Sequence, residues 1–422
     1  MKITLSAPTV LAAVVMTVAA TLIGCTASPD GETVTVDSTT SSTSSTTALA
    51  ETSTTIAGAT GPLAARTNAL GVWTGSEVLI IGGDPEAWCP PDADCSAPDF
   101  SSLTDSAAID PATEQWRRLA PAPAPVNAYS DSVLSADGNS VYVLTRPLFT
   151  ASDRTEPAFM AYDIAGDTWT LLSLPPDTVD VWPTIVALDG GLNGEADESI
   201  LAYLGTHELG TESDQVFDPA TGTWSELPAD PLGPSFDRFV APVGDELLLF
   251  AKDLVDNPGS NSPSLASMAR FDTGTSEWTE IGEAEVLWTD SGVVVGDRIV
   301  FPHSGSSDGG QVNNWGRSIA HGGVYDTANG QWTPLPDGAG DGALDVGGVI
   351  SADGSDVWSI NNSLVDLDAG AWRQVRLGSD KAAEVTGRTV VATDSQIVVF
   401  GGEIWESGEG RVLDDFAVID LN

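Results

Sequence analysis

The sequence predicts an all-β fold made of repeated units. One phrase occurs six times: an apolar residue and an Asp, a short polar turn, and a Trp that opens a second strand. These Trp residues follow one another at steps of 53, 55, 54, 54 and 40 residues. They are Trp116, Trp169, Trp224, Trp278, Trp332 and Trp372. A period of about fifty residues, filled by short strands, is typical of a β-propeller array.

The first unit shows how one repeat divides into four short strands. Apolar runs lie at residues 70–73 and 78–81, and a third run at 107–110 follows a long loop. The fourth strand begins at Trp116. Short polar turns join the first run to the second and the third to the fourth, as expected for antiparallel hairpins. The six Trp residues are expected to pack between neighbouring sheets, because an indole combines a large apolar area with one hydrogen-bond donor.

The last unit contains only the first three runs, at residues 389–392, 397–400 and 416–420. An unpaired sheet edge invites association, so we expect a ring that is closed by the two ends of the chain. Residues 54–58 are predicted to supply the missing strand, with Ile56 in the position of the repeated Trp. The sequence thus favours seven blades over the alternative of six.

A Gly pair ends the second run of the first and last units, at Gly82-Gly83 and Gly401-Gly402. With the Asp-to-Trp spacing, this pattern resembles the kelch-repeat β-propellers, which are related in fold to the propeller of galactose oxidase. The resemblance covers residues 54–422 and implies a seven-bladed kelch-type propeller, although units two to six lack the Gly pair. The copper oxidases of this fold need a Tyr cross-linked to a Cys, which the cysteines of this chain do not favour.

The N-terminus reads as a targeting segment. Lys2 is followed by an uncharged apolar run over residues 3–23, which is typical of a secretory signal. The ending Leu22-Ile23-Gly24-Cys25 resembles the lipobox of bacterial lipoprotein precursors. That resemblance implies removal of residues 1–24, lipidation of Cys25 and an extracytoplasmic location on the bacterial cell membrane. The alternative is an uncleaved membrane anchor, since the apolar run is nearly long enough to span a bilayer.

The chain is predicted to have three parts: a signal peptide at 1–24, a tether at 25–53 and the propeller at 54–422. The middle part is rich in Ser and Thr. It carries too little apolar surface to offset the entropy of ordering, so we expect a flexible tether between membrane and propeller.

Acidic residues outnumber basic ones 61 to 16, which gives a formal charge of −45. Phosphate groups would be repelled by such a chain, so nucleic acid is excluded as a partner. The acidic residues are spread along the chain and are interpreted as a solvated surface.

Cys89 and Cys95 are the two cysteines that would remain after removal of the signal peptide and lipidation of Cys25. Five residues with a Pro pair separate them, and outside the cytoplasm this spacing favours a disulfide. Its closure of a small loop would contribute about 2 kcal/mol. A metal site would need more ligands nearby, and a redox pair usually has two intervening residues.

Strand alternation places the long second-to-third loops and the connections between units on one face. The predicted long loops span residues 84–104, 147–157, 253–266, 303–320 and 402–414. They carry large side chains that the repeat does not need, and the candidate ligand-binding residues are Trp88, Arg154, Trp182, Trp315, Arg317, Trp405 and Arg411. Exposed Trp stacks on sugar rings, and Arg binds carboxylates in a bidentate manner.

His303 and His321 lie at the two ends of the long loop of the fifth unit. They are candidates for a metal site, but no third and fourth ligands with a defined spacing accompany them. No metal or other cofactor is therefore expected.

Two functions from different classes fit these patterns. The favoured one is a lipid-anchored, non-catalytic recognition module that binds a carbohydrate, a peptide or an envelope protein through the long-loop face. The alternative is a propeller enzyme, such as a glycoside hydrolase, lyase or oxidase, with its site at the mouth of the central channel. No nucleophile elbow, zinc-binding helix or phosphate-binding loop is visible in the sequence, so no catalytic residue is assigned.

Overall fold

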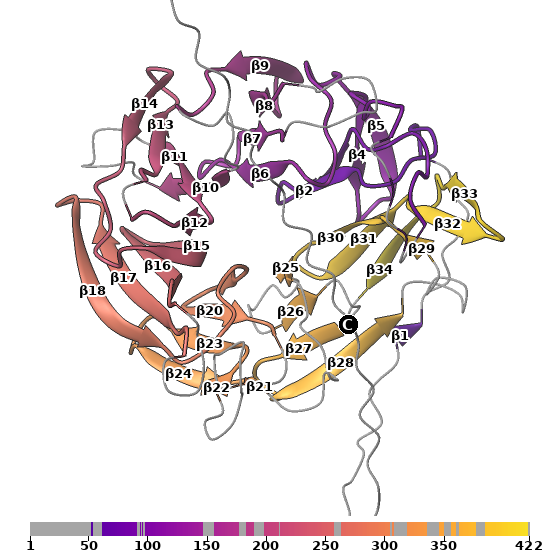
Figure 1. The fold of residues 1–422 in the computed structure, drawn as a ribbon. Coiled ribbons are helices and arrows are strands. Elements are labelled where there is room, and N and C mark those ends of the chain that lie inside the picture. Colours follow the sequence, from indigo (N-terminus) through magenta and orange to yellow (C-terminus); the bar gives the residue numbers. More distant parts are fainter. Residues whose placement is uncertain are drawn as a thin grey trace, which may run out of the picture. The chain divides into compact units, whose positions relative to one another are not determined.

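The computed structural model confirms the all-β class (Figure 1). Every regular element in the described part of the chain is a strand, and all of it belongs to the unit Leu49–Asn422. The structure describes residues 52–53, 61–90, 93, 95, 98–146, 156–176, 183–189, 198–210, 212–256, 263–303, 306–307, 319–335, 346–349, 356–359, 363–376 and 385–420. The predicted signal peptide, Cys25 and Ile56 lie outside these residues.

Among the described residues, seven main sheets follow one another along the chain, and their strands pair antiparallel with their neighbours except for β1 in sheet 6. Sheet 1 contains β2 (Leu70–Trp73), β3 (Val78–Ile81), β4 (Ser106–Asp110) and β5 (Gln115–Leu119). Sheet 2 contains β6 (Asp131–Leu134), β7 (Ser140–Leu144), β8 (Phe159–Asp163) and β9 (Thr168–Leu172). Sheet 3 contains β10 (Pro183–Asp189), β11 (Glu198–Leu204), β13 (Gln215–Asp218) and β14 (Thr223–Glu226).

The remaining sheets vary this four-stranded plan. Sheet 4 contains β12 (Thr206–His207), β15 (Ser235–Val243), β16 (Glu246–Asp253), β17 (Ala266–Asp272) and β18 (Glu277–Ala284). Sheet 5 contains β19 (Val293–Val295), β20 (Arg298–Phe301), β23 (Gly323–Asp326) and β24 (Gln331–Pro334). Sheet 6 contains β25 (Val346–Val349), β26 (Asp356–Ser359), β27 (Ser363–Asp366), β28 (Ala371–Arg376) and β1 (Thr52–Ser53). Sheet 7 contains β30 (Thr389–Ala392), β31 (Gln396–Phe400) and β34 (Phe416–Asp420).

Two small sheets belong to the long connections. One pairs β21 (Ser306–Ser307) with β22 (Ile319–Ala320), and the other joins β29 (Val385–Thr386), β32 (Glu403–Glu406) and β33 (Glu409–Val412). The strand β1 differs from expectation, because it takes the last two residues of the predicted tether and pairs parallel with β28. This pairing covers the edge of sheet 6 and hence reduces its exposed backbone.

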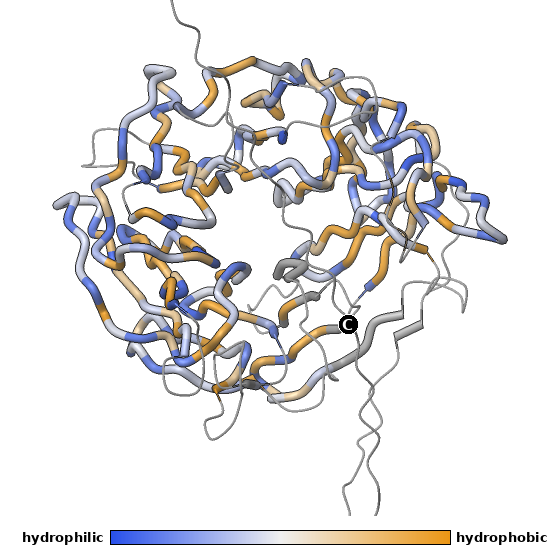
Figure 2. Tube along the Cα trace, in the orientation of Figure 1, coloured by the Kyte–Doolittle hydropathy of each residue, from blue (hydrophilic) through white to orange (hydrophobic). Residues whose placement is uncertain are grey.

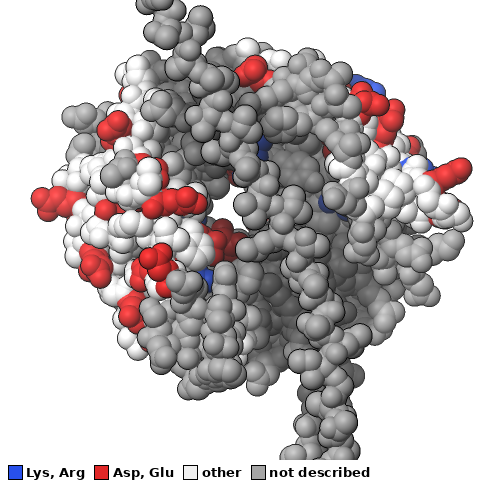
Figure 3. All heavy atoms as spheres, in the orientation of Figure 1, with Lys and Arg blue, Asp and Glu red and all other residues white. Residues whose placement is uncertain are grey.

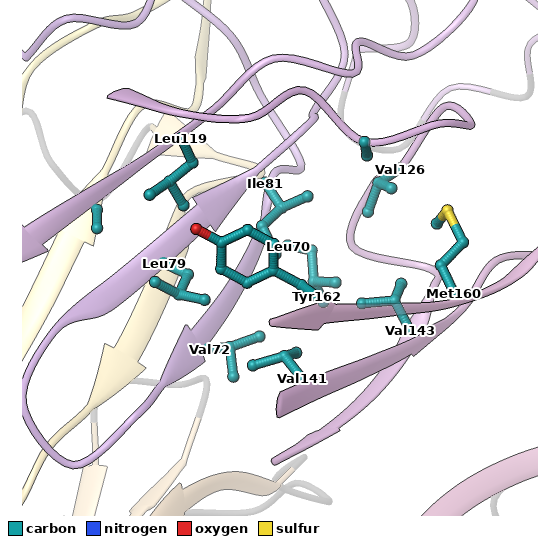
Figure 4. Packing of buried hydrophobic residues seen from close by; sticks show 12 residues of the cluster. Leu70, Val72, Leu79, Ile81, Leu119, Val126, Val141, Val143, Met160 and Tyr162 are labelled. Atoms are coloured by element: carbon teal, nitrogen blue, oxygen red, sulfur yellow. The ribbon is translucent and has the colours of Figure 1, made fainter. Parts of the chain in front are cut away.

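Apolar clusters lie between successive sheets. Figure 4 shows the cluster between sheets 1 and 2, in which Tyr162 lies among Leu70 and Leu79 of one sheet and Val141 of the other. Comparable clusters join sheets 2 to 3, 3 to 4, 4 to 5, 5 to 6 and 6 to 7. A seventh cluster combines residues of sheet 7 with residues of sheet 1. In Figure 2 the hydrophobic segments coincide with strands such as β31 and β34, which supply these clusters.

The repeated Trp residues contribute to the clusters between sheets. Three of them donate from Nε1 to a carbonyl oxygen of the preceding unit: Trp169 to Ala120, Trp224 to Ser173 and Trp278 to Pro228, at 3.0, 2.8 and 2.7 Å. Each hydrogen bond crosses from one unit to the previous one, so the indole both fills the space between two sheets and fixes their distance.

In the first five units the Asp before the Trp forms the turn that the sequence predicts, as for Gly166 N and Asp163 Oδ1. Asp110 accepts hydrogen bonds from the backbone N–H of Ala112 and Thr113, and Asp218 does the same for Ala220 and Thr221. Asp272 and Asp326 repeat the arrangement. These Asp residues are half-buried or exposed and hold local backbone, which matches a structural role. In the sixth unit the expectation of Leu367-Asp368 was wrong, because β27 ends at Asp366 and Ala369 N donates to Asp366 Oδ1 at 2.7 Å.

Sheets 1 and 7 are joined by polar bonds as well as by packing. Thr389 Oγ1 donates to Ala69 O at 2.8 Å, and Asn68 N donates to Gly387 O at 2.7 Å. The ring of Trp116 lies 5.1 Å from that of Phe416, edge to face. Strands close to the two ends of the described chain therefore form one interface.

Candidate functional site

The structure places long connections on one side of the sheets and short turns on the other. In sheet 1 the turns between paired strands span only a few residues, as at Thr74–Glu77, where the backbone closes with a 3.0 Å hydrogen bond. The connection from β3 to β4, in contrast, runs from Gly82 to Asp105. We refer to the end of the sheets that carries the long connections as the long-connection side. Connecting segments of this length are where binding residues concentrate.

Three of the seven candidate ligand-binding residues lie in the described part of the chain. Trp88 is 37% exposed, Trp405 is half-buried in β32 and Arg411 is exposed in β33. The other four, Arg154, Trp182, Trp315 and Arg317, lie outside the described residues.

The hairpin β32–β33 contacts the loop that carries Trp88. Gly410 lies opposite Trp405 in the strand pair, and a Cβ at Gly410 would come 2.7 Å from both the Trp405 ring and Ala87. The absence of a side chain therefore lets the indole and the Ala87 loop close over the same backbone. We call Trp88, Trp405 and Arg411 the Trp405 surface. It combines Trp88 with two residues that lie more than 300 positions further along the sequence.

The disulfide between Cys89 and Cys95 is present, with a Cα–Cα distance of 5.7 Å. It closes the loop directly after Trp88, which limits the positions that this indole can take. The sequence-based expectation of a bridge is confirmed.

Buried carboxylates support the Trp405 surface from below. Glu403 follows the Gly pair of sheet 7 and accepts a hydrogen bond from Trp405 Nε1 at 3.2 Å. Asp84 follows the Gly pair of sheet 1 and accepts hydrogen bonds from Ser102 and Asn68. Both acids are buried, and the pKa of Glu403 is raised because burial disfavours its charged form and the Asp84 charge lies nearby.

A second group lies where sheets 4 and 5 meet on the long-connection side. Asp237 has a left-handed φ of 48° and sits in a bulge of β15, where the register shifts between Phe236 and Phe239. Its pKa is raised, mainly by burial and also by the charge of Asp290, while Lys252 acts in the opposite sense. A bulge of this kind redirects side chains and often occurs beside functional sites.

His303 and His321 meet around Trp288. The Trp288 ring stacks on His303 at 5.3 Å and meets His321 edge-on at 6.1 Å. His303 is buried, and its Nε2 lies 3.2 Å from Ser291 Oγ and 3.8 Å from Asp290 Oδ1. The two histidines that the sequence analysis singled out are thus neighbours. Among the described residues, however, no group of three or more His, Cys, Asp or Glu side chains forms a candidate metal site.

A third group is a buried charge network between sheets 3 and 4. Arg238, from the bulge of β15, donates to Asp214 at 3.0 Å and to Asp230 at 2.9 Å. Its Nη1 donates to Leu204 O at 2.7 Å and lies 2.9 Å from His207 Nε2. We call Arg238, His207, Asp214 and Asp230 the Arg238 network.

The balance of charges in the Arg238 network explains the directions of the pKa shifts of its members. Burial alone would lower the pKa of His207, but hydrogen bonds to Asp214 and Asp230 outweigh it, so the pKa is raised. Burial would raise the pKa values of both Asp residues, but their bonds to His207 and the Arg238 charge lower them. With His207 protonated, two positive and two negative charges cancel in the buried site, which favours the ionised forms.

The sequence analysis missed this network and Asp237. Arg238 stands inside an apolar run, and Asp230 and Asp214 lie in connections that resemble other acidic loops of the chain. The sequence offered no local signal, since other strands of this chain also contain Arg, for example Arg117 in β5 and Arg270 in β17.

No protein-family model and no curated protein matches the chain. The described residues contain no helix that is long and apolar enough to cross a membrane.

Proposed function

We propose that residues 54–422 form a closed seven-bladed β-propeller of the kelch type. Supporting this, the first strands of successive sheets contact one another in the order β2, β6, β10, β15, β19, β25 and β30, and β30 contacts β2. The seven apolar clusters follow the same order and return to sheet 1. The Gly pairs of sheets 1 and 7 also share their conformation, with φ of 62° and 101° in one and 61° and 108° in the other.

Truncation tests the closure. A chain that begins at Leu63 lacks residues 54–58, which are proposed to complete sheet 7. The melting temperature of this chain should fall well below that of the full chain, and also below that of a chain that begins at Thr54, which lacks only β1 of sheet 6, because sheet 7 would lose its fourth strand. An unchanged melting temperature would contradict closure by this segment.

We further propose that the protein is a lipid-anchored recognition module that binds a carbohydrate through the Trp405 surface. The observation that carries this proposal is the exposed Trp88 beside a hairpin with Trp405 and Arg411, held by a disulfide and by buried Glu403. Aromatic faces stack on sugar rings, and an Arg donates to hydroxyl or carboxylate groups of acidic sugars.

A glycan array probed with the full chain tests this function. Trp405→Ala and Trp88→Ala should each abolish binding of the recognised glycan, while Tyr129→Ala should bind normally. Tyr129 is a suitable control because its side chain is 63% exposed and lies outside the Trp405 surface. Equal binding by all three variants would remove the Trp405 surface from the proposal.

The anchor has its own test. Fatty-acid labelling of cells that express the chain should mark the wild type and spare Cys25→Ser. Labelling of the variant at the wild-type level would contradict lipidation of this residue.

A propeller hydrolase is the second candidate, and the group around Asp237 favours it. A half-buried carboxylate with a raised pKa, a second carboxylate at Asp290 and the Ser291–His303 contact are features of sites that transfer protons. Turnover of a glycoside or ester panel that is lost in Asp237→Asn or His303→Gln would support this candidate. Absence of turnover across the panel would contradict a hydrolase for these substrates.

A further inference from the structure

Three loops meet on the long-connection side of sheets 3 and 4. They connect β11 to β13, β14 to β15 and β16 to β17. Gly210 of the first lies against Pro234 of the second, since a Cβ at Gly210 would come 3.0 Å from Pro234 Cδ. Leu254 N, in the third, donates to Pro234 O at 3.2 Å. The loops therefore form one continuous surface around Pro234.

Large apolar side chains project from this surface. Leu209 is 76% exposed and Leu254 is 51% exposed, and Pro231 and Pro234 are exposed beside them. We call these four residues the Leu209 surface. Single exposed apolar residues are common, but several on adjoining loops mark an interaction site.

The backbone under the Leu209 surface is held in place. Leu209 N donates to Glu212 Oε1 at 3.0 Å, and Gly210 N donates to His207 O at 3.2 Å. In the neighbouring loop, Leu232 N donates to Asp230 Oδ1 at 2.9 Å. His207 and Asp230 belong to the Arg238 network, so buried ion pairs fix two of the three loops. A surface that is ordered before binding loses less conformational entropy when a partner arrives.

The exposed charges of the three loops themselves are negative, while Lys252 of the adjoining strand β16 lies over the ring of Phe236. Glu208 and Asp256 are exposed, and Glu212 and Asp253 are half-buried. Apart from the buried His207, the described residues of the three loops include no basic side chain and no aromatic ring. On the face drawn in Figure 3, scattered acidic side chains outnumber the basic ones, in line with the formal charge of −45.

We propose that the Leu209 surface binds a peptide segment of a partner protein in which apolar side chains alternate with Lys or Arg. Apolar side chains of such a segment would cover Leu209 and Leu254, while its basic groups would lie near Glu208 and Asp256. A sugar lacks the apolar bulk and would find no aromatic platform among the described residues of the loops. An anionic membrane would be repelled by the same acids.

This inference is independent of the carbohydrate proposal, because the Leu209 surface belongs to sheets 3 and 4 and the Trp405 surface to sheets 7 and 1. A negative glycan array would not affect the peptide-binding proposal, and a negative peptide-binding result would not affect the carbohydrate proposal. The Trp405→Ala variant should therefore retain full peptide binding.

Fluorescence anisotropy with defined peptides tests the inference on the full chain. The probe is a short peptide that alternates Leu and Lys, compared with one that alternates Leu and Glu and one that alternates Ser and Lys. The Leu–Lys peptide should bind most tightly, and its affinity should fall as salt is raised. The double variant Leu209→Ser, Leu254→Ser should weaken binding about tenfold or more, because truncation of central apolar contacts has effects of this size.

Leu171→Ser is the matched control. Leu171 is 61% exposed on the strand β9, outside the three loops, so its loss should leave binding unchanged. All variants keep the net charge of the chain and remove only exposed apolar atoms, so they should also keep the melting temperature. Equal binding by the double variant and the control would overturn the proposal. It would also be overturned if the Leu–Glu peptide bound as well as the Leu–Lys peptide, or if anionic vesicles bound and the peptides did not.

Discussion

The Leu209 surface and the Trp405 surface both present apolar side chains above buried carboxylates, but the two supports differ in charge. Under the Leu209 surface, Asp214 and Asp230 are paired with Arg238 and His207. Under the Trp405 surface, no ion pair joins Asp84 or Glu403 to a basic side chain in the described part of the chain. The hydrogen bonds there come from neutral groups such as Ser102 and Trp405.

This difference predicts opposite responses to protonation. A buried acid that is paired with a cation stabilises the fold when it is ionised, whereas a buried acid without one stabilises it when it is neutral. The shifts agree with this reasoning, since the pKa values of Asp214 and Asp230 are lowered and that of Glu403 is raised.

The largest expected effect is the loss of a charge from the Arg238 network. Asp214→Asn should destabilise the fold by about 3 to 5 kcal/mol, because it leaves buried positive charge without its partner. Thermal unfolding measures the change. The control is Asp218→Asn at the other end of β13, where the half-buried Asp holds only a local turn. Equal losses of unfolding free energy in both variants would contradict a particular contribution of the Arg238 network to stability.

The clusters beneath the two surfaces should contribute about equally. Trp116→Ala, between sheets 7 and 1, and Trp278→Ala, between sheets 3 and 4, should each cost about 3 kcal/mol, since both remove an indole packed between sheets. Denaturant unfolding compares them. A near-zero effect of Trp116→Ala alone would mean that sheets 7 and 1 do not form an interface like the others.

The pH dependence of the Arg238 network follows from the two signs. The lowered pKa values of Asp214 and Asp230 give stability that is present above about pH 3.9 and is lost as the pH falls through their folded values. The raised pKa of His207 gives stability that is present below about pH 6.5 and is lost as the pH rises through its folded value. The contribution of the network should therefore be greatest between these limits.

The His207→Gln variant tests the loss of stability that is expected as the pH rises through the folded pKa of His207. The melting temperature of the variant should lie furthest below the wild type between about pH 4 and pH 6.5, and the gap should narrow as the pH rises further. A gap that stays constant across this range would contradict a protonated His207 in the fold.

The smallest effect is expected at the Trp405 surface. The pKa of Glu403 is raised in the folded state, so its ionised form lowers the stability of the fold. This destabilisation disappears below about pH 4.3, where the side chain is protonated. Glu403→Gln should therefore raise the melting temperature slightly at pH 7 and leave it unchanged in acid, because Gln resembles the neutral acid. A lower melting temperature at pH 7 would indicate that the carboxylate is needed in its charged form.

Regular features could be predicted from the sequence because they recur. The apolar-Asp phrase marks the third strand and its turn, and the Trp that follows marks the fourth strand, so strands such as β13 and β14 were located without a structure. The disulfide was predictable from two cysteines with a short spacing. Each of these depends on residues that are close together in the chain.

Contacts between loops could not be predicted in the same way. Gly410 and Ala87 come together only because sheets 1 and 7 are neighbours, and Arg238 reaches Asp214 through a bulge that no local pattern marks. The sequence analysis named His303 and His321 as a pair but gave no reason to place Trp288 between them. Such sites depend on three-dimensional proximity, which a single sequence does not encode locally.

The bonds between Thr389 and Ala69 and between Asn68 and Gly387 have a consequence for protein engineering. They join sheets 1 and 7 directly, so a linker between the two ends of residues 54–422 would connect sheets that are already in contact. The chain could then be opened at a different turn, for example between β9 and β10, with every sheet retained. If the proposed lipid anchor were joined to the new N-terminus, it would attach the chain through a different sheet and so present a different group of loops to the exterior.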